Sequence, residues 1–290
     1  MIKAAVRISL VSVALLLGAY CVFTLGRPAP VPVPVKKELF NGVTYHRVVR
    51  FLPHSMIVHV LVIDTKAKGM QFMVTPPDEM EGGAIAARTT SQFLKEFGLQ
   101  IAVNGDGFFP WWSHNPVDYY PHVGDPVTPN GVAASHGVVY ADGMQDTRPE
   151  PTIYFSRRGD ITFNKAPGKL FQALSGDRML ILSGEVVPDL NERILHPRTA
   201  IGTSKNGRWL YLVVVDGRQP FYSTGATYEE LAKLLKDFGA FNAMSLDGGG
   251  SSTMVIAGKN GEPMMLNSPI DNYIPGRERP VANHFGIYIK

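Results

Sequence analysis

A glycine-rich turn that begins with a carboxylate is the sharpest chemical feature of the sequence. Residues 247–254 read Asp-Gly-Gly-Gly-Ser-Ser-Thr-Met. Consecutive glycines let a ligand approach the backbone closely, and the N–H groups and hydroxyls of such a turn can bind an anion. The spacing fits neither a phosphate-binding loop, nor a dinucleotide fingerprint, nor the nucleophile elbow of serine hydrolases. A tight hairpin turn is the alternative interpretation.

Charged side chains also occur within or directly after apolar segments. Arg198 lies in the otherwise apolar run 197–202, where a guanidinium needs an anionic partner, either an Asp or a ligand phosphate. Residues 216–218 read Asp-Gly-Arg at the end of another apolar run, and Asp106 lies in the Asn-Gly-Asp-Gly corner at 104–107. A structural ion pair and ordinary turns are the alternatives.

The histidines and the cysteine exclude several kinds of site. The eight histidines show neither His-Glu-x-x-His nor His-x-His spacing, which argues against zinc. Oxygen ligands need no fixed spacing, so Asp106, Asp216 and Asp247 leave room for a divalent cation such as calcium, although no cofactor is certain. The one cysteine, Cys21, lies in an apolar N-terminal run, so the remaining chain has no disulfide or thiolate chemistry.

Several segments, taken in order, resemble the phosphodiester glycosidase family. The matching blocks are residues 104–109, 175–177, 197–202, 216–218, 226–239, 247–254 and 279–283. The resemblance covers roughly residues 85–290, and it departs from the family's Asn-Gly-Gly-Phe-Phe signature by one inserted residue, Asp106. It implies hydrolysis of a sugar 1-phosphodiester, typically of N-acetylglucosamine, which releases the sugar and leaves a phosphomonoester.

This chemistry defines a candidate site. A phosphate is a weakly basic leaving group, so the site needs cations or N–H donors for the phosphate and a carboxylate near the anomeric carbon. The expected catalytic carboxylates are Asp247, Asp216 and Asp106, of which Asp247 is the most important. Their roles as acid, base or nucleophile stay open, because the distance between them decides those roles. The expected substrate-binding residues are Asn104, Arg198, Thr199, Arg218, Gly248, Gly249, Gly250, Ser251, Ser252 and Asn283.

The elements that must position these residues are mostly strands. A Val- and Ile-rich hairpin is predicted over 43–51 and 56–64, and further strands over 99–103, 209–215, 241–246, 253–257 and 284–289. Helices are predicted over 86–97 and after Thr227, where Glu230 completes a capping box. Each helix leads through a strand to a polar, glycine-rich corner. We expect a single α+β catalytic domain with a mixed or antiparallel sheet core and two or three packed helices.

A long stretch over residues 108–135 has no clear periodicity and is predicted to be an irregular, functional loop. It contains the neighbouring aromatic residues Trp111 and Trp112. These side chains could stack on a sugar ring, or they could pack against their own loop.

The N-terminus predicts export. Residues 1–25 contain two basic residues followed by 18 uncharged, apolar ones, as in a signal anchor or a signal peptide. We favour the anchor because no small-x-small cleavage site follows, and the body would then be periplasmic or extracellular. A Pro-rich linker is predicted over 26–37 and a phosphodiester glycosidase-like domain over 38–290.

The distribution of charge limits the partners. The net charge of +3 comes from residues 1–37, since the remaining 253 residues carry 23 basic and 25 acidic side chains. Nucleic-acid binding is therefore excluded, and we expect a sugar-phosphodiester or polysaccharide substrate, with membrane contact through the N-terminal segment. Together with the predicted export, the family resemblance implies a function in polysaccharide or envelope glycan metabolism. The alternatives are a non-catalytic polysaccharide-binding module and a transferase of the same fold.

Overall fold

The structure is a computed structural model that describes residues 11–19, 33–78, 80, 85–143, 150–190 and 193–290. Residues 11–19 are helical. The flanking parts of the predicted anchor at 1–25, and most of the predicted linker at 26–37, lie outside the described residues. None of the helices within the described ranges has the length and apolar character needed to cross a membrane.

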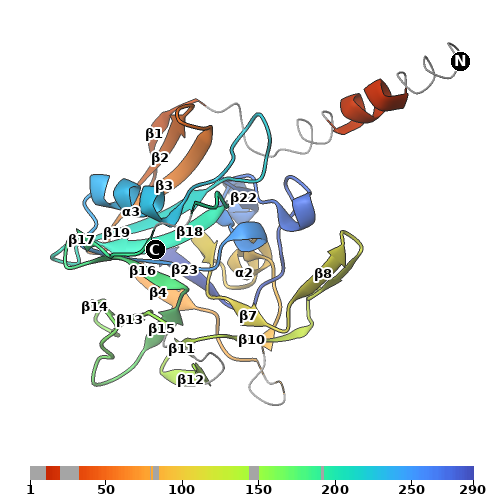
Figure 1. Ribbon diagram of the computed structural model, residues 1–290. Helices are drawn as coiled ribbons and strands as arrows, with labels where there is room; N and C mark the ends of the chain where they lie inside the picture. Colours follow the sequence, from red (N-terminus) through yellow and green to blue (C-terminus); the bar gives the residue numbers. More distant parts are fainter. Residues whose placement is uncertain (1–10, 20–32, 79, 81–84, 144–149, 191–192) are drawn as a thin grey trace, which may run out of the picture.

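The largest sheet contains eight strands and carries several of the predicted elements (Figure 1). Its members, in spatial order, are β1 (Val35–Phe40), β2 (Val43–Arg50), β3 (Met56–Asp64), β19 (Trp209–Val215), β18 (Arg198–Thr203), β20 (Asn242–Ser245), β16 (Arg178–Leu182) and β17 (Glu185–Val186). Strands β2 and β3 form the predicted hairpin, with Tyr45 opposite Leu61.

Two five-stranded sheets complete the body. One has the order β22 (Pro263–Met265), β21 (Met254–Ala257), β6 (Ile101–Asn104), β23 (His284–Ile289) and β4 (Met70–Val74). The other has the order β12 (Val138–Asp142), β11 (Val132–Ser135), β15 (Gln172–Ser175), β13 (Thr152–Phe155) and β14 (Ile161–Phe163). In the described part of the chain, all the named strands pair antiparallel, so the antiparallel form of the two predicted sheet types is the observed one.

The stretch at 108–135 is not irregular, and the prediction of a long loop was wrong. It contains a two-stranded sheet of β8 (Trp112–Asn115) and β9 (Asp118–Tyr120). Strands β7 (Phe108–Phe109) and β10 (Pro126–Pro129) join β5 (Ile85–Ala86) in a three-stranded sheet, and β11 begins at Val132. Strands of two to four residues are too short to show the alternation that identifies a strand in sequence.

Two α-helices of the body follow local capping signals. Helix α3 (Tyr228–Asp237) begins after Thr227, whose side chain accepts from the backbone N–H of Glu230, and this confirms the predicted capping box. Helix α2 (Thr90–Glu96) begins later than predicted, because Thr89 caps it through Gln92 and Ala86 belongs to β5. Short 3-10 turns form at η2 (Gly249–Ser251), η3 (Lys259–Gly261) and η4 (Asp271–Tyr273).

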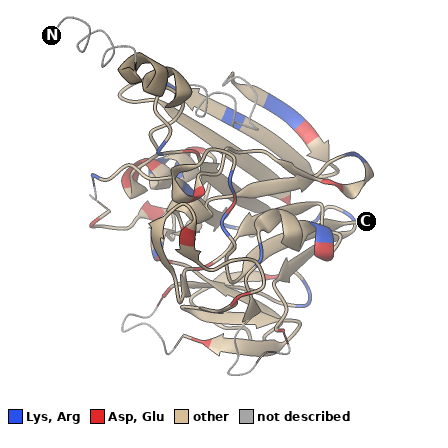
Figure 2. Ribbon diagram, turned by 90° about the vertical axis from the view of Figure 1, so that its right-hand side faces the viewer, with Lys and Arg blue, Asp and Glu red and all other residues tan. Residues whose placement is uncertain are grey.

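The large sheet is buried on both faces, which explains its continuous apolar runs. On β3, Leu61 and Ile63 pack in one core cluster, whereas Val58 and Val60 pack on the opposite face with α3. Burial of this kind fixes the strands, and the loops at their ends then carry the polar residues. Basic and acidic residues are interspersed along the ribbon of the body (Figure 2).

Candidate active site

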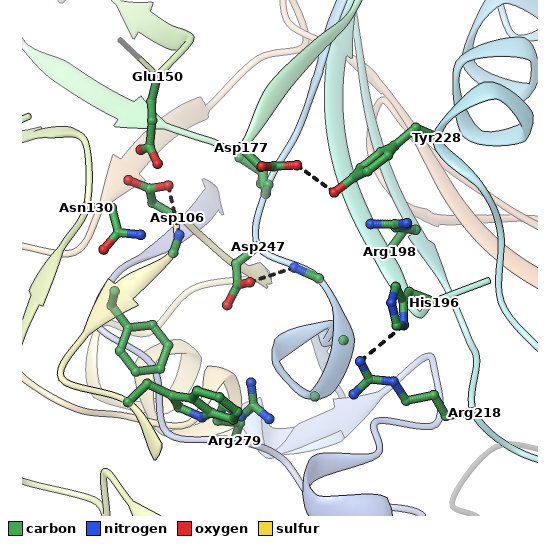
Figure 3. Close-up of a pocket in the computed structure, with 17 residues that line it drawn as sticks. Asp106, Asn130, Glu150, Asp177, His196, Arg198, Arg218, Tyr228, Asp247 and Arg279 are labelled. Carbon is green, nitrogen blue, oxygen red and sulfur yellow. Dashed lines mark hydrogen bonds between the residues drawn. The ribbon is translucent and has the colours of Figure 1, made fainter. Parts of the chain in front are cut away.

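A polar cavity of about 420 Å³ lies where the ends of β6, β18 and β20 meet. Among the described residues, its charged and aromatic lining consists of Asp106, Glu150, Asp177, Asp247, His196, Arg198, Arg218, Arg279, Phe108, Trp111 and Tyr228. In Figure 3, Asp106, Glu150 and Asp247 lie toward one side and Arg198, His196 and Arg218 toward the other. Arg279 lies below Asp247, and Asp177 lies beside Tyr228, so carboxyl and guanidinium groups face the same cavity from several sides.

Two corners that are distant in sequence meet beneath this cavity. Asn104, at the end of β6, donates from its side-chain amide to the backbone carbonyl of Asp247 at 2.8 Å. The N–H of Asp247 donates to the carbonyl of Gly105 at 2.9 Å. The two predicted glycine-rich corners are thus hydrogen-bonded to each other, and this contact places Asp247 at the floor of the cavity.

Asp247 occupies the position that its sequence context predicts, at the edge of the glycine-rich turn. Its carboxylate accepts from the N–H of Gly248 at 2.8 Å and points into the cavity (Figure 3). Burial raises the pKa of Asp247, while the Ser251 hydroxyl and the Arg279 guanidinium act in the opposite direction. The carboxyl group of Asp247 therefore faces the cavity, and its pKa depends on neighbouring groups that include Arg279 of the cavity lining.

The three glycines of the turn, Gly248, Gly249 and Gly250, line the cavity. The N–H groups of Gly248, Gly249, Ser251 and Ser252 donate to acceptors within the protein. Gly249 has a φ of 61°, and a Cβ at Gly250 would lie 2.4 Å from the guanidinium of Arg279. The absence of a side chain at Gly249 and Gly250 therefore lets the guanidinium groups of Arg218 and Arg279 lie close to the backbone.

Asp106 forms a buried carboxylate pair with Glu150. The Asp106 oxygens accept from the N–H groups of Gly107 and Gly131, each at 2.8 Å, and Glu150 faces them (Figure 3). Burial and the neighbouring Glu150 charge raise the pKa of Asp106 well above its ordinary value. Two carboxyl groups in such contact do not both ionise readily, so the pair holds a proton that can be transferred.

Three arginines provide the cationic side. The Arg198 guanidinium stacks on the ring of Tyr228 at 3.6 Å, and its Nε donates to the carbonyl of Ala226. The Arg218 guanidinium lies 3.1 Å from Nδ1 of His196.

Arg279 is held by an ion pair with Asp271 at 2.7 Å and covers the ring of Trp111 at 4.8 Å. Fixed guanidinium groups of this kind suit a phosphate.

The remaining predicted site residues lie behind the cavity. Thr199 donates to Asn104 at 2.7 Å, and Asn283 accepts from the N–H of Asp106 at 2.8 Å, so both position residues of the site. Asp216 does not line the cavity: it is 1% exposed and bonds to His59 at 2.9 Å and to the N–H of Ser268 at 2.8 Å. Asp216 is therefore a structural residue that links β3, through His59, to the segment that contains Ser268.

A comparison with protein families decides the identity of this fold. A family model described as phosphodiester glycosidase matches residues 97–288. The chain belongs to the phosphodiester glycosidase family. Membership supports a phosphodiester glycosidase-like function.

Solved structures of this fold are similar to the chain over most of its length. The catalytic domain of zebrafish N-acetylglucosamine-1-phosphodiester alpha-N-acetylglucosaminidase has a TM-score of 0.61 and 19% identity, with 91% of this chain and 87% of that chain covered. A hypothetical protein from Synechocystis has a TM-score of 0.59 and 14% identity, with 90% and 64% covered. At these identities the likeness concerns the fold.

A curated relative is similar over a shorter region. The SPbeta prophage-derived uncharacterized protein YomE of Bacillus subtilis (strain 168) is 39% identical over 95 residues. The match covers 33% of this chain and 13% of that protein.

Several residues that line the cavity were missed as site residues in the sequence. Asp177 and Arg279 lie in blocks that carry the family resemblance, so that pattern could have found them. Glu150 had no such signal, because it stands alone between two prolines outside the blocks. Trp111 lines the cavity under Arg279, whereas Trp112 is not among the lining residues, so the two tryptophans differ in their surroundings.

Metal-binding side chains do not cluster in the part of the chain that the structure describes. Within it, no three side chains of His, Cys, Asp or Glu are placed to hold a metal ion. Asp106 and Asp247 line the cavity and Asp216 does not, so the three carboxylates predicted as cation ligands are not brought together.

Proposed function

We propose that the protein hydrolyses a sugar 1-phosphodiester, with an N-acetylglucosamine-type sugar as the group released. Family membership supports the reaction class. The observation that carries the proposal is the presence of guanidinium groups and carboxyl groups around a single cavity. A sugar 1-phosphodiester needs both kinds of group. Its phosphate is anionic, and its anomeric carbon becomes cationic in the transition state.

The arginine side binds the phosphate in this proposal. Arg218 and Arg279 are held against His196 and Asp271, so their guanidinium groups are placed before the substrate arrives. Preorganised cations stabilise the charge that develops on the departing phosphate without reorganisation during the reaction. This side supplies the attraction that the net charge of the body, at −2, does not supply.

The carboxyl side acts on the sugar and the water. Asp247 lies between the buried acid pair and the arginines, so we place it beside the anomeric carbon as the group that stabilises positive charge. In the singly protonated Asp106–Glu150 pair, the carboxyl group that remains ionised accepts the proton of the attacking water. The bond between the anomeric carbon and the bridging oxygen breaks, the water oxygen joins the sugar, and the bridging oxygen stays with the phosphomonoester.

The place of this reaction is proposed from the N-terminal sequence. The basic residues and the apolar run within residues 1–25 support export, with the body periplasmic or extracellular and held at the membrane by one N-terminal helix or released. The substrate would then be a phosphodiester of polysaccharide or envelope glycan metabolism.

The test is activity on a panel of sugar 1-phosphodiesters that share one aryl phosphate group, with and without a chelator. Release of reducing sugar together with aryl phosphate supports hydrolysis at the anomeric carbon. Transfer of the sugar to an added glycan would indicate a transferase instead. Binding without turnover of any member would overturn the enzymatic proposal and favour a polysaccharide-binding module.

A further inference from the structure

A second cavity, of about 670 Å³, adjoins the candidate active site and is larger than it. Glu150 and Asp177 line both cavities, so the two share a wall. Arg218 and Arg279 line the first cavity and are not among the residues of the second. The second cavity therefore continues from the carboxyl side of the active site, away from the phosphate-binding arginines.

The chemistry of the second cavity suits hydroxyl groups and disfavours phosphate. Asp142, Glu150 and Asp177 line it together with one arginine, Arg178. The guanidinium of Arg178 is engaged, since its Nε donates to Asp177 at 2.9 Å and it stacks on the Tyr228 ring at 4.1 Å. The excess of carboxylates repels an anion, whereas carboxylates accept hydrogen bonds from sugar hydroxyls.

Regular structure holds the walls of this cavity. Tyr154 lies on β13, where it pairs with Thr162 on one side and Ala173 on the other. Asn164 accepts from the N–H of Thr152 at 3.0 Å. A half-buried tyrosine on the central part of a sheet offers a rigid ring face and a hydroxyl, which are the groups that contact a sugar at little entropic cost.

We propose that the second cavity binds the sugar residues that precede the cleaved one, so the substrate is an oligosaccharide or polysaccharide chain ending in, or interrupted by, a 1-phosphodiester. This inference rests on the proposed function and deepens it. In the bound chain, the phosphate lies on the arginines, the cleaved sugar lies beside Asp247, and the preceding sugars pass Glu150 and Asp177 into the second cavity.

The experiment compares two substrates with the same leaving group. They are the 4-nitrophenyl phosphodiester of N-acetylglucosamine and that of its β-1,4-linked trimer, each assayed for kcat and KM. For the wild-type protein we expect KM to be about tenfold lower for the trimer, because its added sugars form hydrogen bonds in the second cavity; a tenfold change corresponds to about 1.4 kcal/mol. Tyr154→Ala should remove that preference and leave the monosaccharide KM unchanged.

Two further variants keep the test sharp. Tyr154→Phe retains the ring and removes only the hydroxyl, so it should fold and should lose part of the preference. Tyr288→Ala is the matched control, since Tyr288 is also half-buried in a sheet but lines neither cavity. It should keep the preference unchanged.

The outcomes separate the inference from the proposed function. Equal KM values for the two substrates in the wild-type protein would overturn the inference and leave the hydrolytic function intact. A trimer preference that Tyr154→Ala and Tyr154→Phe both retain would also overturn it. If neither substrate is cleaved, the proposed function fails, and calorimetry with the unphosphorylated trimer decides the inference: binding that Tyr154→Ala weakens supports it, and no binding refutes it.

Discussion

The side chain of Asn104 donates to the backbone carbonyl of Asp247 across 143 positions of sequence. The oxygen of the same side chain accepts from the Thr199 hydroxyl at 2.7 Å and from the N–H of Thr253 at 3.1 Å. One buried amide therefore joins the ends of β6 and β20 to the starts of β18 and β21. Asn104 is therefore a positioning residue. It holds the backbone of Asp247 in place and does not itself line the cavity.

Replacing Asn104 should loosen this junction. In Asn104→Ala, the buried N–H of Thr253 and the carbonyl of Asp247 lose their partner, and we expect the free energy of unfolding to fall by about 1–3 kcal/mol. Denaturant titration measures this change. In the folded variant kcat should fall more than KM rises, because the Asp247 carboxylate shifts. If Asn104→Ala is as stable as the wild-type protein, Asn104 does not stabilise this junction.

Asp247 and Asp216 should respond differently to the same substitution. Asp247→Asn should lower kcat on a sugar phosphodiester by about 100-fold or more, with little loss of stability, since the charge beside the anomeric carbon is removed. Asp216→Asn should chiefly lower the melting temperature, because Asp216 bonds to His59, Tyr222 and Ser268. Wild-type turnover by folded Asp247→Asn would exclude its proposed role.

Arg279 and Arg277 form a matched pair, because both make an ion pair with Asp271 and only Arg279 lines the cavity. Arg279→Lys loses the planar fork that suits a phosphate, so KM for the phosphodiester should rise about tenfold. Arg277→Lys should leave KM near the wild-type value. Steady-state kinetics at two salt concentrations check this, and equal effects of the two substitutions would argue against phosphate binding by Arg279.

Glu150→Gln should change the pH dependence of the reaction. Glu150 is a negative neighbour that raises the pKa of Asp106, so its neutralisation lowers that pKa. The limb of the kcat/KM profile that belongs to this pair should therefore move to lower pH. Glu185→Gln, on a side chain that is 85% exposed, is the control and should leave the profile in place. An unmoved profile in Glu150→Gln would show that the pair does not govern the reaction.

His284 should make the fold less stable in acid. This buried ring stacks on Phe93 at 4.8 Å, and burial lowers its pKa from 6.5 to about 3. The unfolded chain takes up a proton more readily than the folded one between these values, so stability contributed by the neutral ring is lost as pH falls from 6.5 toward 3. His284→Gln should flatten this dependence in thermal melts. The exposed His114→Gln should melt with the wild-type dependence.

Local signals in the sequence predicted those features whose cause is local. The capping box of α3 and the β2–β3 hairpin depend on neighbouring residues, and both are confirmed. The start of α2 was misplaced because Ala86 pairs with Pro126, a partner 40 positions away that no local pattern shows. Tertiary pairing of this kind overrides helix propensity.

The sequence predicted that the candidate site contains carboxylates and arginines, but it did not predict every residue that lines the cavity. Asp247, Arg198 and Arg218 line the cavity as expected, because each is a charged residue within or shortly after an apolar run. Asp216 has the same local appearance as a catalytic carboxylate, and only its contacts with His59 and Ser268 show its framework position. Glu150 is the reverse case, since it becomes a partner of Asp106 only when the chain is folded.

The meeting of two remote corners at Asn104 and Asp247 also determines when the protein can acquire activity. The cavity takes Asp106 from the second quarter of the chain and Arg279 from its last twelve residues. A chain cut before Arg279 lacks part of the cavity lining, because Arg279 lies close to the last strand, β23. Under the proposed function, turnover therefore requires almost the whole domain, and its appearance during refolding would report assembly of that domain.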